Sequence, residues 1–242
     1  MTWLKFSPST IVEVGTHAGS LANVARKTFG DAKVELIGDA LTRPRTLLPW
    51  RRLPAPRDGE LSSLPLADGS AELLLSNLDL ARYTTPDTAL AEIARVLRPG
   101  GACVMATLGP DSLRELREAW ATVDAGAHVM EFIDMHDLGE ALMRHGLGEP
   151  VLDVERLSLT YADVGRLWQD LQLARARGVL PARQSRGLTT PAQWARMTDA
   201  LAARSRPVQI TIEIVYLQAW RQLPRDRTSE TRISPSQISK RV

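Results

Sequence analysis

The chain has 242 residues, 44% of them hydrophobic, and 30 Lys and Arg against 28 Asp and Glu give a formal net charge of +2. This length suits one large core, and the balanced charge indicates neither a nucleic-acid nor a membrane partner. The only cysteine, Cys103, excludes a disulfide framework, and we expect it to be a buried thiol. No apolar stretch reaches the roughly 20 residues that span a bilayer, and no signal-like segment is present, so a cytoplasmic protein is expected.

Short apolar runs alternate with helical patterns, which predicts an α/β fold. We expect a Rossmann-like, mostly parallel sheet with an antiparallel edge strand and helices on both faces. The expected strands are residues 10–14, 33–37, 72–76, 102–107, 150–161 and 208–220. The expected helices are residues 21–29, 87–97, 132–142, 167–177 and 191–203, together with part of 111–131.

The last expected strand alternates clearly. Apolar side chains at 208, 210, 212 and 214 predict a buried face, and Gln209, Thr211 and Glu213 predict a wetter one.

Two segments lack such patterns. Residues 42–58 read TRPRTLLPWRRLPAPRD, whose prolines predict an extended basic loop, and residues 223–242 predict a disordered tail. We therefore expect one domain over residues 1–222, with helical cap segments at about 111–146 and 163–205.

A glycine-containing turn, EVGTHAGS at residues 13–20, follows the first strand and precedes a helix. A turn in this place can bind the sugar and tail of a nucleotide-like ligand beyond the carboxyl ends of the strands. Only Gly15 and Gly19 remain of a full glycine fingerprint, so an ordinary strand-to-helix turn stays open as the alternative.

Further polar residues favour the binding interpretation. Asp39 follows the second strand, where its carboxylate could accept both hydroxyls of a ribose. Glu60 and Leu61 lie in a loop that could contact adenine, and Asn77 follows the third strand. Because the ends of parallel strands share one edge, these side chains are expected to line one cleft.

Five segments carry a resemblance to a known family: VEVGTHAGS, IGDA, LPLADGSAELLLSNLDL, EIARVLRPGGACVMATLGPDSLRELREAW and HVMEFIDMHDLGEAL. Together they resemble the class I S-adenosylmethionine-dependent methyltransferases. More narrowly they are similar to the malonyl-acyl-carrier-protein O-methyltransferases of biotin synthesis.

The resemblance implies a role for each polar residue of the cleft. Glu13, Gly15 and Gly19 would hold the methionine part of S-adenosylmethionine, and Asp39 its ribose. Glu60 and Leu61 would hold the adenine, and Asn77 would form the wall near the sulfonium. The resemblance also implies an acyl-carrier protein, or another small acidic thioester, as the substrate.

The helix after TLGPDS is expected to roof the substrate pocket. Arg114, Arg117 and His128 are therefore candidates for contacting the substrate carboxylate, although the two arginines could instead pair with neighbouring glutamates. Basic segments at 51–57 and 175–186 could dock an acidic carrier protein. No catalytic residue is predicted, because a carboxylate is already ionised near neutral pH and needs no general base.

A second function stays open at this point. A degenerate member of the fold would agree with His17, with the missing glycines and with the absence of an expected N-terminal helical lid. Such a protein would bind the cofactor weakly or not at all and would act as a partner-binding or assembly factor.

Overall fold

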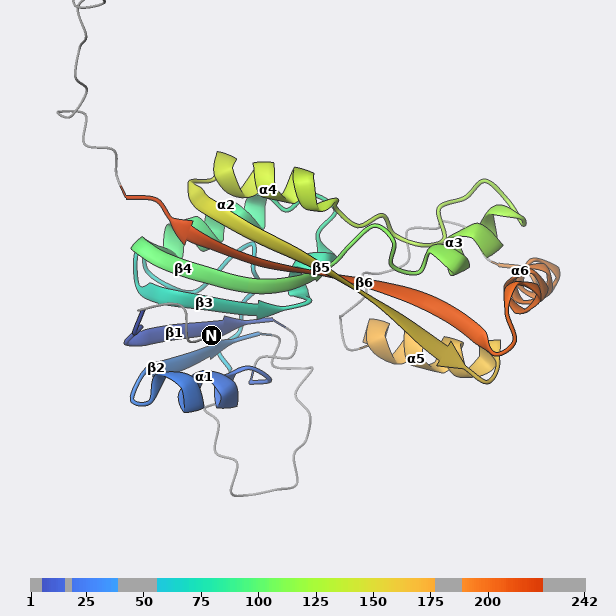
Figure 1. The fold of residues 1–242 in the computed structure, drawn as a ribbon, viewed down its shortest axis with the longest axis horizontal. Coiled ribbons are helices and arrows are strands. Elements are labelled where there is room, and N and C mark those ends of the chain that lie inside the picture. Colours follow the sequence, from blue (N-terminus) through green and yellow to red (C-terminus); the bar gives the residue numbers. More distant parts are fainter. Residues whose placement is uncertain (1–5, 16–18, 39–55, 177–188, 224–242) are drawn as a thin grey trace, which may run out of the picture.

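The computed structural model describes residues 6–15, 19–38, 56–176 and 189–223 (Figure 1). Within these residues one sheet has the strand order β2-β1-β3-β4-β6-β5. The strands are β1 (Thr10–Val14), β2 (Lys33–Ile37), β3 (Ala71–Asn77), β4 (Leu97–Leu108), β5 (Leu147–Tyr161) and β6 (Val208–Arg221). Strands β1 to β4 are parallel, whereas β6 runs antiparallel to both β4 and β5. The expected mostly parallel sheet with an antiparallel edge is confirmed.

Helices cover both faces of this sheet. They are α1 (Ala22–Phe29), α2 (Asp87–Val96), α3 (Arg114–Ala121), α4 (Met135–Arg144), α5 (Val164–Ala176) and α6 (Pro191–Arg204), with the short 3-10 helix η2 (Asp79–Arg82) after β3. Local chemistry sets several boundaries. The side chain of Thr190 caps α6 in a reciprocal capping box with Gln193, and Pro191 takes the first helical position.

Two hydrophobic cores lie on opposite faces of the sheet. Helices α2 and α4 pack on one face, where Leu90, Ile93 and Leu138 are fully buried. Helix α1 packs on the other face over Ile11 and Leu73.

Cys103 lies in the first core with no exposed surface, and burial raises the pKa of its thiol to about 12. The expected buried, unreactive thiol is confirmed.

Strands β5 and β6 form a long, twisted antiparallel pair that runs past the rest of the sheet (Figure 1). The ladder between β4 and β6 ends at Leu108 opposite Ile214, so the first part of β6 extends beyond the carboxyl end of β4. Helices α3, α5 and α6 pack around this extension and bury Leu116, Met197 and Leu201. We call these three helices, with strand segments 157–161 and 208–212, the distal lobe, and the remaining described residues the main body.

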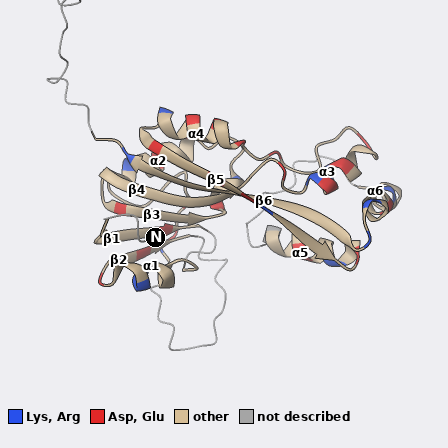
Figure 2. Ribbon diagram, viewed as in Figure 1, with Lys and Arg blue, Asp and Glu red and all other residues tan. Residues whose placement is uncertain are grey.

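The expected cap segments divide between these two parts. Helix α3 belongs to the distal lobe, but α4 packs in the main core through Leu138, Ala141 and Leu142. The interval between α3 and α4 is largely irregular, so the strongly helical character expected over 111–146 holds only for α3 and α4 themselves. The ribbon in Figure 2 carries residues of both charge signs on the main body and on the distal lobe, in keeping with the small net charge.

The alternation expected along the last strand is partly wrong. Thr211 and Glu213 are buried, with 8% and 3% of their surface exposed, whereas Ile212 is only half-buried. The cause is the segment that follows β4, which crosses this face of β6. Its Leu113 amide donates to the carbonyl of Thr211 at 2.8 Å, and the hydroxyl of Ser112 donates to the carbonyl of Glu213 at 3.0 Å.

Five predicted features fall wholly or mostly outside the described residues: His17, Asp39, the basic loop up to residue 55, the basic segment 175–186 from residue 177 on, and the tail from residue 224. The last part of the loop is described. Arg57 pairs with Glu35 at 2.6 Å, and backbone hydrogen bonds join Arg57 to Leu36 and Gly38. This bridge places residues 56–61 beside the carboxyl end of β2.

Candidate active site

The carboxyl ends of β1, β2 and β3 lie side by side at one edge of the sheet. Val14 is opposite Ile37 on β2 and opposite Ser76 on β3. This register brings Glu13, Gly15 and Asn77 to the same edge, as the sequence predicted. We call this edge the carboxyl edge. It comprises Glu13, Gly15, Asn77 and the short helix η2.

Glu13 is a buried carboxylate, with 1% of its surface exposed. Its Oε1 accepts hydrogen bonds from the Ser20 hydroxyl at 3.1 Å and from the Leu21 amide at 2.9 Å. These bonds tie the start of α1 back to β1. The other oxygen, Oε2, has no hydrogen-bond partner among the described residues. A buried acceptor without a donor is costly, which favours a site that a ligand's donor completes.

Gly15 shapes the turn after β1. Its φ of +140° strongly disfavours an L side chain, and an added Cβ would lie 3.2 Å from the Cβ of Asp79. Its amide donates to the carbonyl of Ile37 at 3.0 Å, which fixes the turn to β2. Gly19 also has a positive φ, +104°. The two glycines left in the loop therefore stand at backbone positions that require glycine.

Asp79 was not predicted from the sequence. It begins η2 after Leu78, which has a left-handed φ of +63°, and only 2% of its surface is exposed. Arg82 pairs with it at 3.2 Å. The position of Asp79 against Gly15 gives the carboxyl edge a second buried carboxylate. The available signal was its place two residues beyond a strand end.

The two residues expected at the adenine differ in exposure. Glu60 is exposed, and its backbone pairs with that of Ser63. Leu61 is completely buried in the main core, so its side chain supports the loop from beneath. Any contact of Leu61 with a ligand at this edge would involve its backbone. Asn77, the last residue of β3, is exposed.

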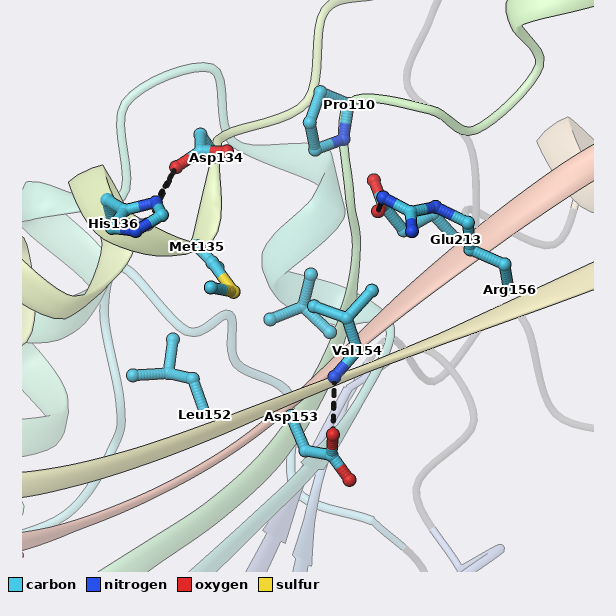
Figure 3. Close-up of a pocket in the computed structure, with 10 residues that line it drawn as sticks. Pro110, Asp134, Met135, His136, Leu152, Asp153, Val154, Arg156 and Glu213 are labelled. Carbon is cyan, nitrogen blue, oxygen red and sulfur yellow. Dashed lines mark hydrogen bonds and ion pairs between the residues drawn. The ribbon is translucent and has the colours of Figure 1, made fainter.

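A cavity of about 450 Å³ lies at the junction of the main body and the distal lobe (Figure 3). We call it the junction pocket. Met135, Leu152, Val154 and Val215 form its apolar part. Its polar residues are Asp134, His136, Asp153, Arg156 and Glu213, and Pro110 completes the lining. Because Pro110 lies two residues beyond the carboxyl end of β4, the pocket adjoins the edge that carries Asn77.

Glu213 and Arg156 are held firmly at one end of the junction pocket. The guanidinium of Arg156 pairs with Glu213 at 2.8 Å and with Asp111 at 3.0 Å. The second carboxylate oxygen of Glu213 accepts the Asp111 amide at 2.9 Å. At the other end, Asp134 caps α4 by accepting the His136 amide at 2.7 Å. This bond, with the one to the His136 ring, lowers the pKa of Asp134.

Comparison with known proteins identifies the family. A methyltransferase domain model matches residues 12–105. The malonyl-[acyl-carrier protein] O-methyltransferase of Laribacter hongkongensis is 38% identical over 93% of this chain and 80% of that protein. The protein of the same name from Halorhodospira halophila is 37% identical over 90% of this chain and 76% of that protein. The chain belongs to the malonyl-[acyl-carrier protein] O-methyltransferase family.

Solved structures agree on the fold of this O-methyltransferase. A methyltransferase-class protein of Bacillus halodurans superposes with a TM-score of 0.58 at 15% identity, covering 91% of this chain and 95% of that chain. The YcgJ protein of Bacillus subtilis superposes with a TM-score of 0.56 at 13% identity, covering 90% and 94%. These structures confirm the fold. The relatives of 37–38% identity confirm the enzyme class implied by the sequence resemblance and favour it over a degenerate assembly factor.

The three candidate substrate residues of this O-methyltransferase lie in or beside the distal lobe. Arg114 is exposed and pairs with Glu115 at 3.1 Å, the neighbour pairing considered from the sequence. Arg117 donates to the carbonyls of Pro110, Ser112 and Met130, so it holds the segment after β4. Neither arginine lines the junction pocket.

His128 also has structural contacts. Its ring stacks on Trp120 with centroids 3.9 Å apart, and Nε2 lies 2.7 Å from Asp124. Its side chain is 8% exposed. These contacts give each candidate a structural role, but Nε of Arg117 and Nδ1 of His128 are buried without a partner among the described residues, so the substrate role stays a prediction. Among the described residues, no helix of this O-methyltransferase is long and apolar enough to cross a membrane.

Proposed function

We propose that this chain methylates the free carboxylate of malonyl-acyl-carrier protein, with S-adenosylmethionine as methyl donor, as a step of biotin synthesis. The observation that carries the proposal is the carboxyl edge, where a buried oxygen of Glu13 has no donor among the described residues and adjoins a turn that requires glycine. Family membership supplies the reaction class, and the relatives' names supply the substrate.

The described residues fit the cofactor at the carboxyl edge. Oε2 of Glu13, which has no partner in the described part of the chain, suits the ammonium group of the methionine part, because a buried carboxylate gains most from a charged donor. Gly15 and Gly19 allow the close backbone approach that this part needs. Asn77 would form the wall near the sulfonium, with Glu60 and Leu61 near the adenine, and Asp39, outside the described residues, would hold the ribose. The cofactor supplies an electrophilic methyl group when bound.

Alignment and exclusion of water are the main tasks left to this chain. A malonyl carboxylate is ionised near neutral pH, so its oxygen attacks without losing a proton. The attack is in line with the bond from methyl carbon to sulfur, and holding the two partners in that geometry accounts for much of the rate. This agrees with a site whose polar groups are binding groups and include no nucleophile paired with a base.

Calorimetric titration with S-adenosylmethionine and S-adenosylhomocysteine tests the cofactor step. We expect binding of both, and we expect Glu13→Gln to weaken it while Glu72→Gln does not. Glu72 is the matched control because it lies on β3 at the opposite edge, where it bonds to Ser9. An absence of binding at millimolar ligand would favour the degenerate-fold alternative instead.

Methyl ester formation on malonyl-acyl-carrier protein tests the substrate. Turnover of a different acyl acid, with no turnover of the malonyl substrate, would keep the enzyme class and overturn the proposed substrate.

The basic segments 51–57 and 175–186 are proposed to dock the acidic carrier protein. If they do, the KM for the carrier-bound substrate rises with ionic strength, while the KM for a small malonyl thioester changes little.

A further inference from the structure

We propose that the junction pocket binds the uncharged, amide-bearing pantetheine portion of the acyl thioester substrate. The proposal rests on the function proposed above, because only a carrier-bound or similar thioester has such an arm. It adds a subsite to the carboxyl edge and names the residues that form it.

The position of the pocket is the first argument. It opens between the main body and the distal lobe, next to the carboxyl end of β4. β4 lies two strands from β1 and the turn of Gly15, and the strands that line the pocket, β6 and β5, follow β4 in the sheet. A substrate whose acyl end reaches the carboxyl edge can therefore extend its arm into this pocket. Its volume, about 450 Å³, is in the range of small-molecule sites.

The distribution of apolar and polar groups is the second argument. Figure 3 shows Met135, Leu152 and Val154 between a polar end at Asp134 and His136 and another at Arg156 and Glu213. An apolar middle with polar ends suits a chain of methylene and dimethyl groups separated by amides. Such a ligand buries its carbon against the apolar side chains and needs acceptors for its N–H groups.

The charge of the pocket decides between a neutral and an anionic ligand. Among the described residues that line it, Arg156 is the only arginine or lysine, and two carboxylates, Asp111 and Glu213, pair with it. Asp134, whose pKa is lowered by its bonds to His136, stays ionised at neutral pH. Carboxylates therefore outnumber cations here. A phosphate or a carboxylate would be repelled, whereas an amide N–H finds acceptors.

Asp134 is the acceptor best placed for such an amide. Its Oδ1 receives both bonds from His136, and half of its side chain is exposed at the pocket. The second oxygen can therefore accept an N–H from a ligand. Replacement by Asn keeps an oxygen that caps α4 but removes the charge, so Asp134→Asn tests the ligand contact without removing the cap.

Two matched substitutions on β5 test the pocket directly. Val154→Phe fills it, whereas Val151→Phe adds the same bulk at a neighbouring position that is 63% exposed and does not line the pocket. The probes are pantetheine and phosphopantetheine in titrations, and malonyl-pantetheine as a small substrate. Thermal unfolding of each variant, and its affinity for S-adenosylhomocysteine, show whether the fold and the carboxyl edge are intact.

For the folded variants, Val154→Phe is expected to weaken pantetheine binding and raise the KM of malonyl-pantetheine tenfold or more, with kcat little changed. Asp134→Asn is expected to raise this KM several-fold, and Val151→Phe to leave it unchanged. An unchanged KM in both Val154→Phe and Asp134→Asn would overturn the inference. A second result would also overturn it. If phosphopantetheine binds much more tightly than pantetheine, and Arg156→Gln abolishes this tighter binding, the phosphate lies in the pocket.

The two proposals fail in different ways. If the wild-type protein binds pantetheine in the pocket but methylates no malonyl thioester, the proposed function fails and the subsite stands. If it methylates malonyl-pantetheine and filling the pocket has no effect, the function stands and the subsite is wrong.

Discussion

Two buried glutamates, one at each end of the candidate site, differ in how their oxygens are satisfied. Glu13 at the carboxyl edge uses one oxygen for Ser20 and Leu21 and leaves the other without a partner among the described residues. Glu213 beside the distal lobe uses both, one for Arg156 and one for the Asp111 amide. Their exposed fractions are nearly the same, 1% and 3%.

Burial alone therefore does not separate a binding carboxylate from a structural one. A carboxylate with all its acceptors engaged stabilises the fold, and removing it leaves buried donors unpaired. A carboxylate with a free acceptor weakens the fold unless a ligand completes it. Glu213 should hence act mainly on stability and Glu13 mainly on ligand affinity, and each substitution below tests one side of this contrast.

The largest expected effect is on stability, from Glu213→Ala. The substitution removes the acceptor of the Asp111 amide and the partner of Arg156, which join the segment after β4 to β6. We expect the free energy of unfolding to fall by about 2–3 kcal/mol. Urea denaturation measures it. The control is Glu155→Gln, an exposed residue that bonds only to Tyr216, with an expected change within about 0.5 kcal/mol. Equal losses in the two variants would remove the structural role assigned to Glu213.

Gly15→Ala should affect both stability and affinity. At a φ of +140° an alanine is strained, and its Cβ would press on Asp79 at 3.2 Å. We expect a loss of about 2 kcal/mol in unfolding free energy, with weaker cofactor binding. Gly30→Ala is the control: its φ is +58°, and nothing lies within 4 Å of an added Cβ. Its ψ of −111° also strains an alanine, so that variant should lose about 1–3 kcal/mol and still bind the cofactor normally. A normal affinity in Gly15→Ala would separate this turn from the cofactor site.

Glu13→Gln should act mainly on affinity. The amide oxygen can still accept from Ser20 and Leu21, so the turn is retained, but the charge that suits an ammonium group is lost. We expect the Kd for S-adenosylmethionine to rise about tenfold, which corresponds to about 1.4 kcal/mol. Calorimetry measures the Kd, and thermal unfolding of the ligand-free variant should change little. A large drop in stability with unchanged affinity would make Glu13 equivalent to Glu213 and break the comparison.

The sequence was sufficient for the sheet and for much of the carboxyl edge. Strand alternation and glycine placement are local signals, and the ends of parallel strands meet by topology, so Glu13, Gly15 and Asn77 were found. Glu213 was expected on a wet face because its covering segment, residues 109–113, lies about a hundred positions earlier in the chain. The junction pocket was missed for the same reason. It combines Pro110, the start of α4 and the two strands β5 and β6, which only tertiary packing brings together.

The smallest expected effect concerns Asp87, a half-exposed carboxylate whose Oδ1 accepts two bonds. Asp87 at the start of α2 bonds to His145 at 2.9 Å and to Arg144 at 3.2 Å, at the end of α4. The bond from His145 contributes most to lowering the pKa of Asp87, and the bond from Arg144 contributes next. A lowered folded-state pKa stabilises the protein above the unfolded value, about 3.9, and this contribution is lost as the pH falls through the folded-state pKa.

Asp87→Asn should therefore lower the melting temperature slightly near pH 7, and the difference from the wild type should shrink as the pH is lowered below about 4. The pair is exposed, so solvent and salt screen it, and 1 M salt should also reduce the difference. Thermal unfolding at several pH values measures both. A difference that stays constant with pH and salt would assign the effect of Asp87 to the start of helix α2, and the link between α2 and α4 would then not depend on charge.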